Sequence, residues 1–218
     1  NAFVGIQAEA LFLNGNPTQL GHLSLKNTII KNCSGVGLLT AYFNVVAENT
    51  VISNCNEYNA VVQGRGNWRF DHCTFANYTG GSSRETQAVF IKNNYSVGST
   101  IFVDTPNVAI RNSIVYGSAE TEFNIEVINN GSANVSVLNS ILKTDENTSD
   151  ANKYISILKN PPNEIFNDVD GDDFELYDNS RARNLGNVTI GSSIPQDLNN
   201  KPRPSSDGLP DAGAYEFQ

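Results

Sequence analysis

The chain has 218 residues and a formal net charge of −9, and its 14 Lys and Arg residues form no run. This argues against nucleic acid or an anionic membrane surface as the main partner, because both attract clustered positive charge. No apolar stretch approaches the roughly 20 residues that a membrane-spanning helix needs. The sequence also has no Met and no signal peptide, so we expect a mature chain or an excised fragment.

A short phrase returns along the chain, as in LKNTIIKNC from Leu25 and AENTVISNC from Ala47. Each copy has apolar residues at two alternate positions, the pattern of a strand with one buried face. The first of these positions holds Leu23, Val45, Trp68, Val108 and Val135. The second holds Leu25, Ala47, Phe70, Ile110 and Val137. We expect these side chains to form a core.

The alternation changes phase two positions later, so each strand must turn there. That position holds Asn27, Asn49, His72, Asn112 and Asn139. Asn tolerates the left-handed backbone conformation, so the pattern predicts a tight corner in every copy. Stacked corners would also align the Asn amides in a hydrogen-bonded ladder.

A third strand fits between successive copies, in stretches that begin at Gly35, Asn59, Gln87, Asn124 and Tyr154. Two insertions, residues 79–86 and 93–106, explain the long step from His72 to Asn112. The pattern predicts an all-β, single-stranded solenoid of about five or six rungs, each with three short strands. An antiparallel sandwich is the alternative, but it does not explain why the corner phrase returns with its columns intact.

The cysteines, Cys33, Cys55 and Cys73, are too few for a disulfide framework. Cys33 and Cys55 occupy equivalent positions in neighbouring copies, so a bridge between them is one interpretation. The one that we favour is that the free thiols pack as small apolar side chains.

The repeated columns resemble those of right-handed parallel β-helix proteins of the pectate-lyase-like superfamily, over residues 1–160. Residues 161–218 resemble the C-terminal region of bacterial secreted β-helix proteins of the choice-of-anchor Q type. The matching residues are Phe166, Asp168, Phe174, Leu176, Ser180, Ala182, Gly186, Asp197, Arg203, Asp211, Gly213, Ala214, Tyr215 and Glu216. The resemblance implies a secreted or cell-surface bacterial protein, commonly one that handles glycans, but it implies no particular reaction.

Residues 161–218 also leave the repeat and are rich in Pro, Asp, Asn and Gly. The end of a solenoid exposes strand edges and apolar core, which require a cap. We therefore expect this segment to wrap the last rung as an irregular cap within the same domain. Its expected core consists of Phe166, Phe174, Leu176 and Tyr215.

A charged row is the first candidate site, on the outer face of the strand before the corner. Its members are Lys26, Glu48, Asp71 and Arg111, followed by Leu138. Stacking would bring Glu48 and Asp71 to about 5 Å, the carboxylate separation of a retaining glycosidase. However, flanking cations are also typical of an ordinary solvated face, and we favour that interpretation.

A second candidate face is formed by the third strands, where the superfamily resemblance places the active cleft. The residues expected to point outward there are Gly37, Leu39, Val61, Gln63, Val89, Ile91, Glu126 and Ile128. Arg65 is a further catalytic candidate, and Lys92, Arg111 and Glu126 are candidate ligand-binding residues. An error of one residue in strand register would exchange inside for outside.

The stretch DVDGDD places Asp168, Asp170 and Asp172 at alternate positions, as calcium loops do. Asp-Gly-Asp is also ordinary turn chemistry, and the terminal Glu of a calcium loop is missing. Calcium is therefore the one ion that the sequence suggests, and no other cofactor is expected.

Together these features predict a monomeric, secreted or cell-surface β-helix that binds or presents to glycans, without catalysis in this chain. One alternative is a polysaccharide lyase or glycosidase that uses Glu48 and Asp71 or Arg65. The other is a structural stalk or adhesin segment.

Overall fold

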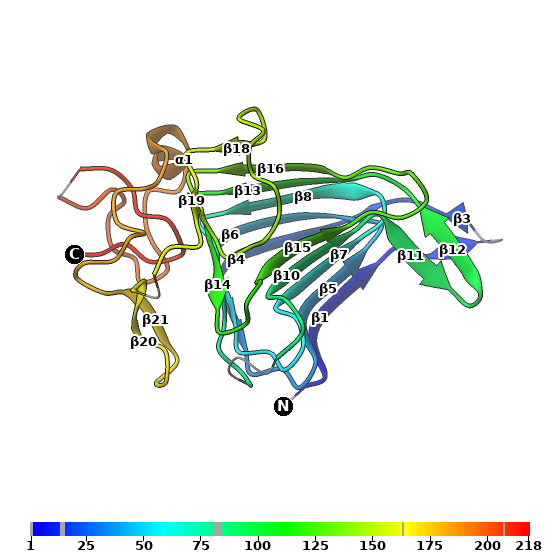
Figure 1. Cartoon of the computed structure of the whole chain (residues 1–218), viewed down its shortest axis with the longest axis horizontal. Helices are drawn as coiled ribbons and strands as arrows, with labels where there is room; N and C mark the ends of the chain where they lie inside the picture. Colours follow the sequence, from blue (N-terminus) through cyan, green and yellow to red (C-terminus); the bar gives the residue numbers. More distant parts are fainter. Residues whose placement is uncertain (1, 14–15, 81–83, 163, 207) are drawn as a thin grey trace.

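The computed structural model describes residues 2–13, 16–80, 84–162, 164–206 and 208–218. Within these ranges the chain consists mostly of strands with one short helix, and successive copies of the repeat pair in parallel (Figure 1). The all-β prediction is confirmed, and parallel pairing excludes the antiparallel sandwich. No described helix has the length and apolar character needed to cross a membrane.

A five-stranded parallel sheet is built from the predicted third strands and one strand before them. Its members, in spatial order, are β1 (Val4–Glu9), β5 (Val36–Ala41), β7 (Ala60–Gln63), β10 (Val89–Lys92) and β15 (Phe123–Glu126). Four of the five predicted third strands lie here. They pair in register, so that Leu39, Val61 and Phe90 are direct neighbours.

The corner phrases form a larger, curled parallel sheet. Strands before the corner are β8 (Gly66–Asp71), β13 (Pro106–Arg111), β16 (Asn134–Leu138) and β18 (Tyr154–Ile155). Strands after it are β9 (Thr74–Asn77), β14 (Ile114–Gly117), β17 (Ile141–Leu142) and β19 (Leu158–Lys159). Both halves are continuous in β4 (Gly21–Lys31) and β6 (Phe43–Ser53), and β6 pairs with β4, β8 and β9.

Every predicted corner residue adopts the left-handed conformation, with φ between 46° and 49°. The prediction that the stretch from Tyr154 forms a third strand is wrong. Ser156 has a φ of 52°, and the flanking strands β18 and β19 pair with β16 and β17. This stretch is therefore another copy of the corner, in which Ser replaces Asn.

The core lies between the two sheets and contains the predicted apolar columns. Phe70 and Ile110 are fully buried, and Leu25 is 6% exposed. Trp68 also packs there, and its Nε1 donates a hydrogen bond to Oγ1 of Thr40 at 2.9 Å.

All three cysteines are free and buried, so the favoured interpretation of the thiols is confirmed. Burial raises the pKa of Cys55 to about 12. This thiol is therefore un-ionised at neutral pH and packs as an apolar side chain.

Two hairpins extend from one end of the strands (Figure 1). Insertion 93–106 forms β11 (Asn94–Val97) and β12 (Thr100–Val103), and β2 (Phe12–Leu13) pairs with β3 (Asn16–Pro17). Aromatic rings join them, because Phe12 lies 5.3 Å from Tyr42, 5.5 Å from Tyr95 and 5.0 Å from Phe102 between ring centroids. Of insertion 79–86, residues 81–83 lie outside the described residues.

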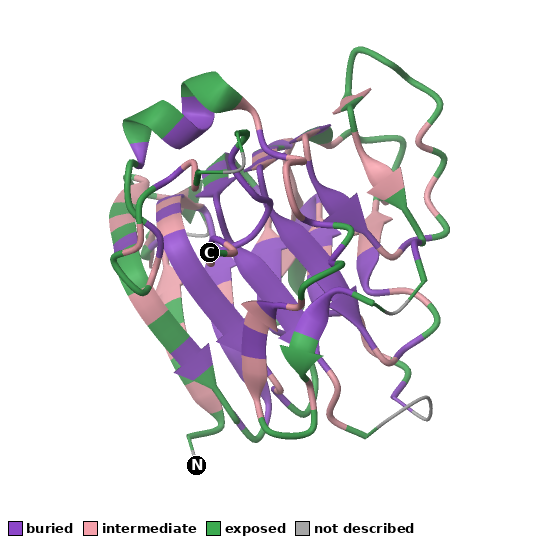
Figure 2. Cartoon of the chain, turned by 90° about the vertical axis from the view of Figure 1, so that its left-hand side faces the viewer, coloured by how far each residue is buried: buried purple, intermediate pink, exposed green. Residues whose placement is uncertain are grey.

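The C-terminal segment packs along the side of the stack, which differs from the predicted wrap over its last rung. It contains β20 (Phe166–Asp168), β21 (Asp173–Leu176) and helix α1 (Val188–Ser193). The outward row of the strands after the corner, which includes Val51, Ile114 and Ile141, is buried against it. Figure 2 views the molecule from this side, and the strands there are largely coloured as buried. Strands that are apolar on both faces need cover on both, which explains this position.

Phe166, Phe174 and Leu176 are buried in the contact that the segment makes with the stack, and Tyr215 packs against them. Asp172 also reaches the stack, where it accepts hydrogen bonds from Asn32 and Asn54. The segment therefore spans several coils.

Candidate functional site

Three rows of side chains cross the outer face of β4, β6, β8, β13 and β16. They form because neighbouring strands pair in parallel and in register. The amide row consists of His22, Asn44, Asn67, Asn107 and Asn134. The floor row consists of Ser24, Val46, Arg69, Ala109 and Ser136. The ion row consists of Lys26, Glu48, Asp71, Arg111 and Leu138.

A groove of about 710 Å³ lies over the amide and floor rows. It reaches from His22 on the first of these strands to Lys153 beside the last. The groove therefore runs across the strands, along the direction in which the coils stack. Its floor is nearly flat because the side chains there, apart from Arg69, are small or aliphatic.

Side chains of the amide row hold one another in place. Oδ1 of Asn44 accepts from both the backbone nitrogen and Nδ2 of Asn67, each at 3.0 Å. Nδ2 of Asn134 donates to Oδ1 of Asn107 at 2.9 Å. Among the described residues, no side-chain partner is found for Nδ2 of Asn44 or for Oδ1 of Asn67. The row thus presents pre-oriented donors and acceptors to the groove.

The ion row has two neighbouring carboxylates with a cation on either side, and Arg69 joins it from the floor row. Glu48 contacts Lys26 at 3.0 Å and Arg69 at 3.1 Å. Asp71 contacts Nε of Arg69 at 3.0 Å and is held by two bonds of 2.6 Å from Arg111. Only 2% of Asp71 is exposed.

The predicted adjacency of Glu48 and Asp71 is therefore confirmed, because the two face each other in the register of β6 and β8. A glycosidase pair needs one protonated carboxyl and one that is free to attack or to activate water. Here each carboxylate already lies between two cations. These ion pairs join side chains of β4, β6, β8 and β13 across the sheet.

The other candidate residues do not converge on one site. Arg65 is exposed in the turn between β7 and β8. Lys92 and Glu126 lie side by side on the five-stranded sheet, with Nζ 3.5 Å from Oε1. Arg111 belongs to the ion row on the curled sheet, so it does not join them.

The predicted outer face of the five-stranded sheet is wrong by one residue in β10. Val89 and Ile91 are fully buried in the core, and Phe90 points outward, where it stacks on Tyr58 with centroids 5.5 Å apart. The stretch around them is uninterrupted apolar sequence, so no alternation fixes its register.

The three aspartates proposed for calcium lie in and beside the turn between β20 and β21. Oδ1 of Asp168 accepts from the backbone nitrogen of Gly171, and Asp172 forms an ion pair with Lys31 at 3.6 Å. Within the described ranges, no three His, Cys, Asp or Glu side chains are grouped as a metal site. In this structure Asp168 and Asp172 thus make turn and contact interactions.

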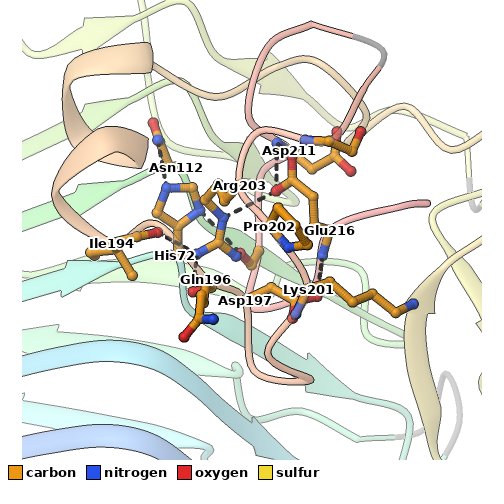
Figure 3. A network of polar contacts seen from close by, with 12 residues as sticks. His72, Asn112, Ile194, Gln196, Asp197, Lys201, Pro202, Arg203, Asp211 and Glu216 are labelled. Atoms are coloured by element: carbon orange, nitrogen blue, oxygen red, sulfur yellow. Dashed lines mark hydrogen bonds and ion pairs between the residues drawn. The ribbon is translucent and has the colours of Figure 1, made fainter.

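A second polar cluster lies beneath the C-terminal segment (Figure 3). Arg203 is completely buried, and its Nε donates to Glu216 at 3.0 Å while Nη1 donates to Oδ1 of Asn49 at 2.7 Å. Asp197 and Asp211 accept from backbone nitrogens within the segment, including those of Glu216 and Phe217. Four residues of the C-terminal resemblance thus join the segment to itself and to a corner.

His72 is the corner residue enclosed by this cluster. Its Nδ1 donates to the carbonyl of Gly213 at 3.3 Å, and its Nε2 accepts from Nδ2 of Asn112 at 2.9 Å. Burial, together with the charges of Arg203 and Arg111, holds the pKa of His72 well below its ordinary value. The corner amides form the predicted ladder only in part, since most bond to the C-terminal segment.

The sequence contained a signal for the amide row that was missed. An Asn directly precedes the first apolar column in four copies, as Asn44, Asn67, Asn107 and Asn134. In a parallel stack, repetition at one outward position predicts a row of amides that bond to one another, as Asn44 and Asn67 do.

Comparison of the chain with protein-family models, with curated proteins and with solved structures finds no match.

Proposed function

We propose that this chain is a right-handed parallel β-helix of the pectate-lyase-like kind, and that its groove binds an extended glycan chain. Parallel strands joined by crossover connections are right-handed in nearly all proteins, which supports the handedness. The C-terminal resemblance supports a secreted or cell-surface location in a bacterium. Both carboxylates beside the groove are held in ion pairs, which favours binding over catalysis.

The observation that carries the proposal is the amide row along the groove. An Asn side chain offers a donor and an acceptor together, as a sugar hydroxyl does. One such side chain follows another at the inter-strand spacing of about 4.8 Å, a repeat comparable to one sugar unit of an extended chain. Val46 and Ala109 in the floor row are apolar, which suits the apolar faces of sugar rings.

A lyase or glycosidase is the weaker alternative. For acid–base catalysis, Glu48 or Asp71 would have to break its ion pair with Arg69. Breaking such a pair in a partly buried position is energetically unfavourable. Arg65 does not line the groove, so it is not placed to act on a ligand bound in it.

Removing two central amides is expected to weaken glycan binding. The double variant N67A/N107A should bind about tenfold less tightly, because each lost hydrogen bond contributes about 0.5–1.5 kcal/mol. Affinity electrophoresis in gels that contain soluble cellulose, xylan, mannan or galactan derivatives would measure the change.

The matched control is Asn124→Ala, which removes an amide from the five-stranded sheet. It should retain the affinity of the unaltered protein. If no polymer retards the unaltered protein, or if N67A/N107A binds as well as it does, the proposed function is wrong.

A further inference from the structure

The charges at the groove are already neutralised within the protein. Arg69 is the cation on the floor, and it lies between Glu48 at 3.1 Å and Asp71 at 3.0 Å. Lys153, at the far end, has its own partner, Asp150, at 3.8 Å. Both cations therefore already have a carboxylate partner within the protein.

A ligand carboxylate or sulfate could take Arg69 only by competing with two protein carboxylates. Losing the guanidinium would leave Asp71, which is 2% exposed, with one partner fewer in a nearly buried position. Leaving a buried charge short of its partners is strongly unfavourable. The net charge of −9 on the whole chain adds long-range repulsion of any polyanion.

We propose, on the basis of the proposed function, that the groove selects uncharged polysaccharides and that Glu48 sets this selectivity. The amide row supplies the hydrogen bonds, which hydroxyl groups satisfy and which carry no preference for an anion. Glu48 occupies two cations, Lys26 and Arg69, that would otherwise attract acidic sugars.

The test uses two pairs of polymers that share a backbone and differ in charge. These are hydroxyethyl and carboxymethyl cellulose, and methyl-esterified and de-esterified polygalacturonan. We expect the unaltered protein to bind the uncharged member of a pair more tightly, by about tenfold, in biolayer interferometry at low salt.

Glu48→Gln should reverse part of this preference. It frees Lys26 and leaves Arg69 with Asp71 as its one carboxylate partner. The affinity for the acidic member should rise by roughly five- to tenfold, with an increase that salt abolishes. The side chain of Glu48 is 18% exposed, and Gln has nearly the same size and shape. The substitution therefore needs no rearrangement of neighbouring side chains. The control is Glu175→Gln, which has the same charge change at an ion pair with Lys201 in the C-terminal segment and should alter neither affinity.

The outcomes separate the two claims. Tighter binding of the acidic polymers by the unaltered protein, or no gain from Glu48→Gln, overturns the selectivity inference and leaves glycan binding intact. Failure of all four polymers to bind overturns this inference, and it contradicts the proposed function as well if xylan, mannan and galactan also fail to retard the protein.

Discussion

Replacing Arg203 with Met is expected to lower the free energy of unfolding by about 3–5 kcal/mol. The guanidinium is fully buried and pairs with Glu216, which is equally buried. It also donates to Asn49 and to the carbonyl of Gln196. Met has a similar length but donates nothing, so the Glu216 carboxylate would be left buried without its counter-charge. Urea unfolding followed by circular dichroism would give the difference.

The control for Arg203 is Arg181→Met, in the same segment. Arg181 is exposed, so its replacement should change the free energy of unfolding by no more than about 0.5 kcal/mol. Limited proteolysis adds a second readout, since R203M should expose residues 161–218 before the coils. Equal stability of R203M and R181M would show that the buried cluster does not hold the segment.

Replacing His72 with Asn is expected to reduce the acid sensitivity of the fold. The folded pKa of His72 lies below its unfolded value, so its contribution to stability is complete above about pH 6.5. That contribution is lost as the pH falls, because a second proton on Nε2 would face the Asn112 amide donor and Arg203. From about pH 7.5 to about pH 5.5 the unaltered protein should lose about 1.4 kcal/mol more than H72N.

Asn suits this position because four other corners already use it at nearly the same φ. Glu216 titrates with the opposite sign, since burial raises its pKa to about 7 and its contribution falls as the pH rises. Both proteins carry Glu216, so the difference between their urea midpoints at each pH isolates His72. Parallel pH profiles would rule out a buried neutral His72 as a source of acid sensitivity.

The sequence was most informative where local chemistry and periodicity coincide. A left-handed corner admits few residue types, so Asn27, Asn49, Asn112 and Asn139 marked the coils, and the apolar columns before them marked the core. Ser156 makes the same turn without Asn, so the sequence around it predicts a third strand instead of a corner. In β10 the run of apolar residues left its register undetermined.

The C-terminal segment shows what periodicity cannot reveal. Its hydrophobic residues identified a packed element, but not which surface it covers. Adjacent apolar pairs such as Val51–Ile52 and Ile141–Leu142 indicate strands buried on both faces, and this points to the side of the stack. The contact from Arg203 to Asn49 joins positions distant in sequence, which no local pattern encodes.

The candidate site was predictable in part. The ion row followed from the repeat register, and the cations that flank its two carboxylates argued for an ordinary solvated face. Whether Arg69 would join Glu48 and Asp71 depended on side-chain conformation, which the sequence does not fix. The groove is lined by side chains from five strands and by Lys153, and their arrangement in space is a tertiary property that no single stretch of sequence encodes.

The most direct test of glycan recognition is nuclear magnetic resonance of the Asn side-chain amides. Oligosaccharides of cellulose, xylan and mannan would be titrated into the labelled protein. The Nδ2 resonances of Asn44, Asn67, Asn107 and Asn134 are expected to shift together with at least one of them, while that of Asn124 stays in place. Shifts confined to Asn124 and its sheet, or none at the amide row with any probe, would contradict the proposal.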